Sequence, residues 1–293
     1  MSPSWAYAAL IFVDIIAAGT FLVAKETTSR FTPLELGWFR IWLSFLMIAP
    51  IFWVINKKEP IPRPKGRDLL LLVAMGLTGI TANQLLFLHG IHLAPALDGA
   101  LLYSFTPIVV LLAARFLFGE SLTWQKLLGI VAAISGVFLV LRSRGLALST
   151  DYLMGDLIML LAVLAWAAYT LLGKALMGRY PAIGANFYAF GVGALSLLPL
   201  APFILSQFDW SRPGLAGWLG LFYLSGMTSL VSFTLWTWAL KILDASRVAI
   251  FANLQPPFTA VLAWLFLNEI PTPAVVIGGT LVISGVTLAQ LRK

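Results

Sequence analysis

The feature that most constrains this chain is an internal repeat, because the stretch 98–141 recurs 149 positions later. The tetrapeptide Ile-Ser-Gly-Val at 134–137 returns without a gap at 283–286. The other matched pairs are Pro107 with Pro256, Glu120 with Glu269, Thr123 with Thr272, and Gly129 with Gly278. Self-similarity at one offset indicates a chain built from related units. We therefore predict two halves, residues 1–144 and 145–293, and expect the functional site where they meet.

The composition places these halves in a membrane. Of the 293 residues, 60% are hydrophobic and 11% are charged, whereas a soluble domain carries ~25% charged residues. The mean hydropathy is +0.93, and the apolar runs are ~20 residues long, which is the length that crosses a bilayer. The absence of cysteine excludes disulfide bonds and thiolate metal sites. The net charge of +7 lies mostly in short loops between apolar runs, so we interpret it as a topology signal and expect no nucleic-acid partner.

Ten apolar runs predict ten transmembrane helices and therefore an all-α membrane protein. The predicted helices are Trp5–Ala24, Leu34–Ile55, Leu69–Leu88, Pro95–Phe118, Trp124–Leu141, Gly155–Leu176, Ala185–Leu205, Leu215–Leu240, Ser246–Leu267 and Pro273–Leu291. Loops after the even-numbered helices, with the C-terminus, hold thirteen Lys and Arg residues, whereas the opposite loops hold five. By the positive-inside rule both termini should be cytoplasmic, and we expect a multi-pass protein of the cell inner membrane.

An odd number of helices in each half requires the second half to enter the membrane from the opposite side. Such inverted repeats are typical of secondary transporters, whose binding site lies near mid-membrane between the halves. An old duplication without alternating access is the other interpretation of the same pattern.

The residues resemble the EamA-type branch of the drug/metabolite transporter superfamily. The resemblance rests on the two five-helix units, the glycine-rich helices, and the motifs Gly119-Glu120, Asn268-Glu269, Arg40 and Ala165-Trp166. It implies a basket of helices around a central cavity, peripheral fifth and tenth helices, and export or exchange of small metabolites. Within the family the chain is similar to the amino-acid exporters, including the YddG type that handles aromatic amino acids. One departure is Ala18-Gly19 in the first helix, where family members often carry a tryptophan-glycine pair.

Asp14 is the sharpest candidate for a functional residue, because a carboxylate near mid-bilayer costs at least ~2.5–3.5 kcal/mol. Ala18, Phe21 and Lys25 follow it at helical spacing, so we predict that this stripe faces a cavity. Asp14 could carry a proton or bind a cation, or it could be held in a structural hydrogen bond or ion pair. Arg40 could be its counter-ion, could bind a substrate carboxylate, or could extend to the outer interface. The resemblance favours a structural role for Arg40, because this side chain recurs in the family whatever the substrate.

Other polar and aromatic residues inside the predicted helices are candidates for the cavity lining. Amides in a membrane helix must bond a ligand or a neighbouring helix, and the prolines at 107 and 256 open the helical hydrogen bonding beside further polar residues. The candidates are Asn83, Gln84, Phe87, Tyr103, Thr106, Trp166, Tyr169, Ser232, Trp236, Asn253 and Gln255. Packing and helix-internal hydrogen bonds are the competing explanations for each of them.

Several other motifs predict structure and not chemistry. Glu120 precedes a helix whose expected N-cap is Thr123, where negative charge is favourable. The glycines at 129, 136, 278 and 285 form small-residue stripes that suit close helix packing. His89 and His92 lack further ligands at matching spacing, so we predict no metal site. We assign them to a solvated helix end, with a pH-sensing or proton-accepting role as the alternative.

The sequence thus predicts a transporter and not an enzyme. It contains no phosphate-binding loop, zincin helix or nucleophile elbow, and we expect no cofactor. We predict a monomer in the lipid bilayer that exports or exchanges a small molecule, most simply a neutral or aromatic amino acid. Proton coupling through Asp14 is one hypothesis. The alternatives are an exporter of lipophilic cations and a transporter of another small metabolite.

Overall fold

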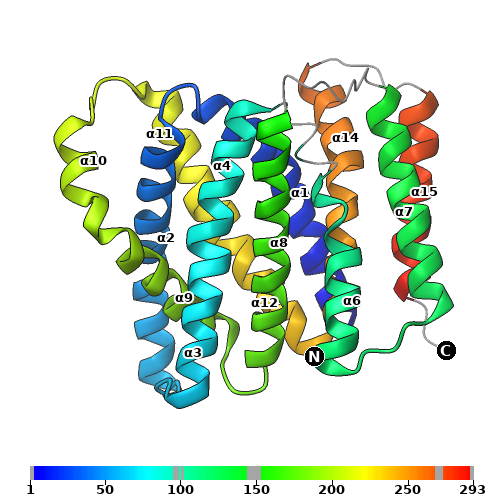
Figure 1. Ribbon diagram of the computed structural model, residues 1–293, viewed down its shortest axis with the longest axis horizontal. Helices are drawn as coiled ribbons and strands as arrows, with labels where there is room; N and C mark the ends of the chain where they lie inside the picture. The colour runs from blue at the N-terminus through cyan, green and yellow to red at the C-terminus, as the bar shows by residue number, and fades with distance from the viewer. Residues whose placement is uncertain (1–2, 95–98, 100–101, 144–152, 268–272, 291–293) are drawn as a thin grey trace.

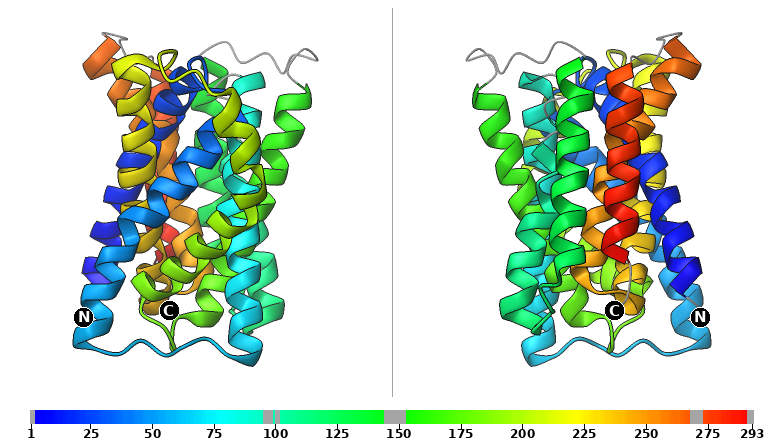
Figure 2. Two further views of the ribbon diagram at one scale, coloured as in Figure 1. Left: turned by 90° about the vertical axis from the view of Figure 1, so that its left-hand side faces the viewer. Right: turned by 90° about the vertical axis from the view of Figure 1, so that its right-hand side faces the viewer.

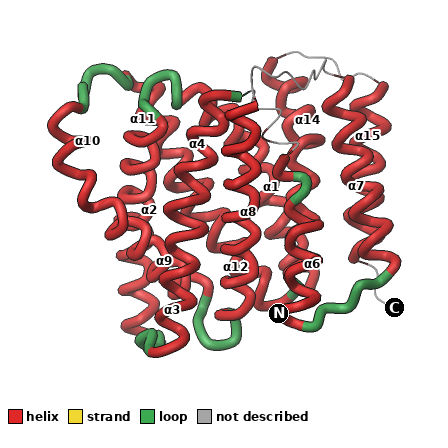
Figure 3. Tube along the Cα trace, in the orientation of Figure 1, coloured by secondary structure: helices red, strands yellow, loops and turns green. Residues whose placement is uncertain are grey.

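The computed structural model describes residues 3–94, 99, 102–143, 153–267 and 273–290. Within these ranges every regular element is helical (Figure 3), so the all-α part of the predicted fold class is confirmed. The elements are α1 (Pro3–Thr27), α2 (Pro33–Lys58), α3 (Gly66–Met75), η1 (Gly76–Ala82), α4 (Asn83–Leu93), α6 (Thr106–Phe118), α7 (Trp124–Ser143), α8 (Leu153–Leu176), α9 (Ala182–Leu197), η3 (Leu198–Leu200), α10 (Ala201–Gln207), α11 (Gly214–Phe222), η4 (Tyr223–Ser232), α12 (Phe233–Ile242), α13 (Ala245–Ala249), η5 (Ile250–Leu254), α14 (Gln255–Leu267) and α15 (Pro273–Gln290).

The described helices include six segments that are long and apolar enough to cross a membrane. They are Ser4–Thr27, Pro33–Lys58, Gly66–Leu93, Leu153–Leu176, Ala182–Gln207 and Gly214–Ile242. Two further apolar helices, Thr106–Phe118 and Val276–Ala289, are shorter. The number of ten crossings therefore remains a prediction. The Asn268-Glu269 turn, the predicted helix start at Pro95 and the connection 144–152 lie outside the described residues.

Two of the predicted helices are not continuous, which corrects the sequence-based assignment. In the first half, α6 begins only at Thr106, after a turn at 104–105. In the second half, the 3-10 helix η5 separates α13 from α14, which begins at Gln255. Pro107 and Pro256 occupy the second position of α6 and α14, where a backbone N–H would have no partner within the helix, so the N–H that proline lacks is not missed. A helix that begins at each proline accounts for both breaks.

Equivalent lysines make equivalent contacts in the two halves. Lys25, in the last turn of α1, donates to the carbonyl oxygens of Ile91 at 2.9 Å and Ala94 at 3.0 Å. Lys174, in the last turn of α8, donates to the carbonyl oxygens of residues 240 and 243 at 2.9 and 2.7 Å. These acceptors lie 149 positions after the two acceptors of Lys25. Helix α1 ends at the upper end of the bundle and α8 ends at the lower end (Figure 1). The fold is therefore consistent with two similar halves of opposite orientation.

The helices α7 and α15 pack side by side at one edge of the bundle (Figures 1 and 2), as the resemblance implies for the fifth and tenth helices. A Cβ added to Gly129 would lie 2.5 Å from the carbonyl oxygen of Gly285, and one added to Gly136 would lie 2.4 Å from that of Gly278. Only glycine allows this backbone approach, so the small-residue stripes face each other across one interface.

This interface predicts a stability effect for a single methyl group. Gly136→Ala should lower the free energy of unfolding by about 1–3 kcal/mol, because overpacking forces the two helices apart. The measurement is thermal or chemical unfolding of the purified protein in detergent. Gly178→Ala is the matched control, because nothing lies within 4 Å of a Cβ at that position. Equal stability of the two variants would contradict the close packing of α7 and α15.

Candidate functional site

A cavity lies between the two halves of the chain. The space that it leaves for the centres of water molecules is about 80 Å³, whereas one buried water needs only ~10–15 Å³. Its lining comes from α1, α2, α4, α8, η4, α12, α14 and the residues just before α6. The lining residues are Val13, Ala17, Thr20, Phe21, Arg40, Asn83, Phe87, Tyr103, Trp166, Thr228, Ser232, Phe233, Trp236 and Gln255. The cavity thus has the position that a transporter site between repeats requires.

Most of the candidates chosen from sequence meet in this cavity. Those that line it are Phe21, Arg40, Asn83, Phe87, Tyr103, Trp166, Ser232, Trp236 and Gln255. Those that are buried without lining it are Asp14, Gln84, Thr106, Tyr169 and Asn253. The lining also includes residues that the sequence did not single out, among them Thr20, Thr228 and Phe233.

Aromatic rings form the apolar walls of the cavity. Phe21 meets Phe87 edge-on with ring centroids 5.6 Å apart, and Tyr103 lies 6.0 Å from each of them. On the second-half side, Trp166 and Trp236 lie 5.3 Å apart. These spacings are typical of favourable edge and offset contacts, so the walls are packed surfaces that can accept an apolar or aromatic group.

Arg40 supplies a positive charge to the cavity wall. Helix α2 begins with a capping box, in which Glu35 N–H donates to the Thr32 hydroxyl at 3.3 Å and Thr32 N–H donates to the Glu35 carboxylate at 2.8 Å. Pro33 occupies the favoured first position. This start places Arg40 seven residues along α2, roughly 10 Å into the bundle at 1.5 Å per residue.

The guanidinium of Arg40 is buried but incompletely paired. The residue is 3% exposed, and its Nε donates to the Ser229 hydroxyl at 2.9 Å. Across the described part of the chain, no carboxylate forms an ion pair with it, and its two terminal nitrogens make no hydrogen bond. Asp14 is therefore not its counter-ion in this structure. A guanidinium presents donors in a planar fork that matches a carboxylate.

The amide of Asn83 is held in place by both halves. Its Nδ2 donates to the Tyr103 hydroxyl at 2.8 Å and to the carbonyl oxygen of Ala162 at 2.8 Å. Another link between the halves is the hydrogen bond between the Thr20 and Thr228 hydroxyls at 2.8 Å. These contacts fix the polar groups of the lining before any ligand arrives.

Two π-helical segments occupy equivalent places beside the cavity. The segment η1 (Gly76–Ala82) directly precedes Asn83. The segment η4 (Tyr223–Ser232) contains residues 225–231, which correspond to η1 under the repeat offset of 149, and it ends on Ser232, which corresponds to Asn83. Wide turns of this kind are rare and frequently occur at functional sites. Because an extra residue in a turn rotates the rest of the helix, these segments set the direction in which Asn83 and Ser232 point.

Asp14 lies behind the lining and not on it. Its side chain is fully buried; Oδ1 accepts a hydrogen bond from Gln255 Nε2 at 3.3 Å, and Oδ2 has no partner among the described residues. Gln255 in turn lines the cavity, so the carboxylate is connected to the site through one amide. The face of α1 that lines the cavity carries Val13, Ala17 and Phe21. This face is rotated by about one residue from the predicted stripe of Asp14 and Ala18.

The remaining candidates fall into two groups. Tyr169 donates to Asn186 at 2.6 Å and lies 2.9 Å from the Thr237 hydroxyl, so its polar group is satisfied within the helix packing. Gln84 and Asn253 are buried, and within the described parts of the chain neither amide has a partner for its oxygen or its nitrogen. The Thr106 hydroxyl is likewise buried without a partner in those parts. Unsatisfied buried groups are costly, which marks them as candidates for contacts made in another conformation.

The described residues contain no group of three or more His, Asp or Glu side chains that could hold a metal ion. His89 is bonded through Nδ1 to the carbonyl oxygen of Leu85, one turn earlier, at 2.8 Å.

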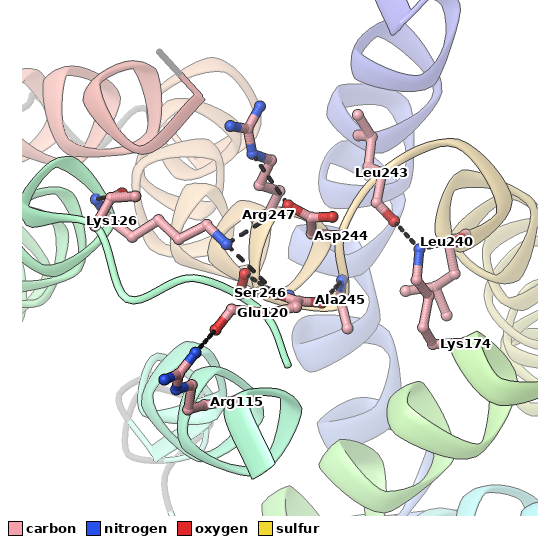
Figure 4. Close-up of polar contacts among 11 residues, drawn as sticks. Arg115, Glu120, Lys126, Lys174, Leu240, Leu243, Asp244, Ala245, Ser246 and Arg247 are labelled. Carbon is pink, nitrogen blue, oxygen red and sulfur yellow. Dashed lines mark hydrogen bonds and ion pairs between the residues drawn. The ribbon is translucent and has the colours of Figure 1, made fainter. Parts of the chain in front are cut away.

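A second polar cluster joins the two halves at the lower end of the bundle (Figures 1 and 4). We call this cluster of Glu120, Lys126, Asp244, Ser246 and Arg247 the lower polar network. Glu120 accepts from the N–H of residue 245 at 2.8 Å and from the Ser246 hydroxyl. Lys126 Nζ lies 3.5 Å from the carboxylates of both Glu120 and Asp244, and Arg247 Nε lies 3.6 Å from Asp244. Glu120 and Lys126 are 8% and 4% exposed, whereas the Asp244 side chain is 48% exposed, so the network has a buried centre and an exposed edge.

The network corrects the predicted role of one glutamate. Thr123 accepts from the N–H of Lys126 at 3.3 Å, which confirms it as the N-cap of α7. Glu120 does not serve that helix; its carboxylate reaches the first N–H groups of α13 in the other half. The negative charge therefore caps a helix start as expected, but across the interface between the halves.

Comparison with known proteins agrees with the fold. The sequence profile described as the EamA-like transporter family matches residues 4–142 and again residues 153–291. A probable terminal-alkyne amino-acid exporter of Streptantibioticus cattleyicolor is 33% identical over 231 residues, covering 78% of this chain and 76% of the exporter. An S-adenosylmethionine uptake transporter of Rickettsia prowazekii is 25% identical, covering 89% of this chain and 84% of that protein.

A solved crystal structure shares the fold, with a TM-score of 0.79 at 19% sequence identity, covering 99% of this chain and 98% of that one. Because the family profile matches nearly the whole sequence in two copies, the chain belongs to the EamA-like transporter family.

Proposed function

We propose that this protein is a secondary transporter for small metabolites with an α-amino acid group, working by alternating access between residues 1–144 and 145–293. Ten crossings in two inverted sets of five, both termini in the cytoplasm, and residence in the inner membrane complete the arrangement. The equivalent lysine contacts at opposite ends of the bundle support the inversion.

The observation that carries the amino-acid assignment is Arg40. A buried cation is stable only with a partner, and the described residues provide Arg40 with a hydroxyl and no carboxylate. A substrate carboxylate would complete the pairing, and its apolar side chain would lie between the rings of Phe87 and Trp166, which line the same cavity. The lining therefore favours a neutral amino acid with an aliphatic or aromatic side chain.

The relatives are compatible with this substrate class. Their names specify terminal-alkyne amino acids in one case and S-adenosylmethionine in the other, and both molecules contain an α-amino acid group. One name specifies export and the other uptake, so we keep export or exchange as the proposal for this chain. A lipophilic-cation exporter fits less well, because Arg40 would repel the cargo and Asp14 does not line the cavity.

Asp14 is the residue through which we propose proton coupling. Its carboxylate is fully buried, has one oxygen without a partner in the described structure, and reaches the cavity through Gln255. No ion pair involves it among the described residues. A proton taken up there would neutralise a charge that is costly at this depth, and substrate binding at Gln255 would be coupled to that step.

The lower polar network provides the gate in this scheme. It joins the first half to the second at the lower end of the bundle through Glu120. Opening the cavity toward that end requires these contacts to break, because they hold α13 against the segment that precedes α7. Secondary transporters alternate by such movement of one repeat against the other.

Transport in proteoliposomes tests the proposal. We expect the wild-type protein to exchange a labelled neutral amino acid against an internal pool, and a pH gradient to drive net movement. Asp14→Asn should keep the exchange and lose the response to the gradient. An unchanged gradient response in Asp14→Asn would remove this residue from the mechanism, and the absence of exchange for every amino acid would contradict the substrate class.

A further inference from the structure

A groove separate from the central cavity opens at the lower end of the bundle, between the end of α2 and the start of α9. Phe52 and Phe187 form its floor, with their rings stacked at a centroid distance of 3.9 Å. Tyr188 borders it, with its ring 5.6 Å from Phe52. The space that it leaves for water-sized molecules is about 400 Å³, which is much more than the central cavity offers.

The groove is held open by the connection between α2 and α3. This connection crosses the base of the bundle (Figure 2, left). Ile61 N–H donates to the Asn56 side chain at 2.8 Å, and Asp68 forms an ion pair with Arg179 at the turn before α9. The walls are therefore tied to the helices at both ends of the connection, so the groove is part of the fold.

Its charge is positive and unneutralised. Arg63 lines the groove. Its guanidinium makes no hydrogen bond or ion pair with any described residue. The segment 57–67 contains five basic residues and one acidic residue. Lys57 and Lys58 form the last turn of α2, next to the groove. An anionic group is therefore the natural complement of this rim.

Its depth matches the boundary of the membrane. Trp53 lines the groove and is 64% exposed, and Val54 beside it is 58% exposed. Exposed tryptophan near a helix end is typical of the level where lipid headgroups begin. The groove thus offers an aromatic floor on the side of the acyl chains and a guanidinium on the side of the headgroups.

We propose that this groove binds one anionic phospholipid, with its phosphate at Arg63 and its glycerol and upper acyl chain against Phe52 and Trp53. A soluble anion would use the arginine but not the aromatic floor, and a zwitterionic lipid would use the floor but gain less from the excess positive charge. The proposal does not depend on which substrate the central cavity transports.

Native mass spectrometry of delipidated protein, incubated with equal amounts of phosphatidylglycerol and phosphatidylcholine, tests the site. The wild-type protein should retain one phosphatidylglycerol in preference to phosphatidylcholine by roughly five-fold, which is the factor that one basic residue near the surface contributes. Arg63→Ala should bring this ratio close to one. Arg67→Ala, which removes an equal charge from an exposed position outside the groove, should leave it unchanged.

Equal effects of Arg63→Ala and Arg67→Ala would overturn the site, as would equal retention of the two lipids by the wild-type protein. Displacement of the lipid by millimolar inorganic phosphate alone would show a simple anion site and would overturn the lipid assignment. Arg63 is exposed, so we expect Arg63→Ala to unfold at the wild-type temperature, and Arg63→Lys should keep part of the preference.

Discussion

Replacing Arg40 with alanine should weaken binding of the preferred amino acid at least tenfold. Hydrogen bonds to charged groups contribute about 1.5–3 kcal/mol each, and 1.4 kcal/mol corresponds to a factor of ten in Kd. The two terminal nitrogens of Arg40 have no hydrogen-bond partner among the described residues, so both are available to a carboxylate. Equilibrium binding of the labelled amino acid to the purified variant measures the effect.

Substrate analogues separate a direct contact from a general disturbance of the fold. The matching amino alcohol lacks the carboxylate, so its weaker binding should be the same in the wild-type protein and in Arg40→Ala. The affinity of Arg40→Lys for the amino acid should lie between those of the wild-type protein and Arg40→Ala, because lysine keeps the charge but not the planar fork. Ser229→Ala removes only the partner of Nε and should cost less. If Arg40→Ala weakened acid and alcohol equally, the guanidinium would not be the carboxylate receptor.

Replacing Glu120 with alanine should destabilise the protein by about 3–5 kcal/mol, the cost of removing one partner from a buried ion pair. Lys126 is 4% exposed and would keep only Asp244, at 3.5 Å. The N–H of residue 245 would lose its acceptor. Unfolding in detergent measures the change, and we expect it to be the largest stability effect of any charged residue in the lower polar network.

The control for Glu120 is an exposed pair of the same chemistry. Glu26, whose side chain is 66% exposed, contacts Arg30 at 3.0 Å, and such surface pairs contribute about 0–1 kcal/mol. Glu26→Ala should therefore leave the unfolding transition almost unchanged. Similar shifts in Glu26→Ala and Glu120→Ala would mean that the lower polar network does not hold the halves together.

The parts of the fold that depend on local chemistry were predictable from the sequence. The offset that aligns Lys25 with Lys174 also aligns their acceptors, because similar stretches of chain fold into similar helices. The Thr123 cap and the glycines of α7 were recognisable because capping and close helix contact each need a narrow set of residues. The helix breaks before the prolines were only partly predicted, since a proline can also produce a simple kink.

The cavity lining was harder to predict, because sequence position indicates how deep a residue lies in the membrane but not which face of its helix points into the cavity. Sequence position placed Asp14 near mid-bilayer, but Val13 and Ala17 line the cavity, and small apolar residues give no signal that distinguishes lipid, core and cavity. The contact between Thr20 and Thr228 joins residues that are far apart in the chain. The wide turns of η1 and η4 have no recognised sequence signature, and they rotate the helices that continue from them.

Arg40 shows the same limit from the energetic side. The resemblance to the family favoured a structural role for it, because an arginine at this position recurs there whatever the substrate. Only the spatial arrangement of the described residues places the guanidinium on the cavity wall, bonded to Ser229 and to no carboxylate. The partner of a buried charge depends on which residues the fold brings together, and residue types and spacing in the sequence do not identify it.

The central claim is that the cavity between the halves recognises an α-amino acid through its carboxylate. Calorimetric titration of the purified protein with phenylalanine, phenethylamine and tetraphenylphosphonium tests it directly, because all three carry aromatic rings and only phenylalanine adds a carboxylate to its positive charge. We predict saturable binding of phenylalanine, and at least tenfold weaker binding of phenethylamine, which lacks the carboxylate. Tight binding of tetraphenylphosphonium, with no competition from any amino acid, would contradict the account.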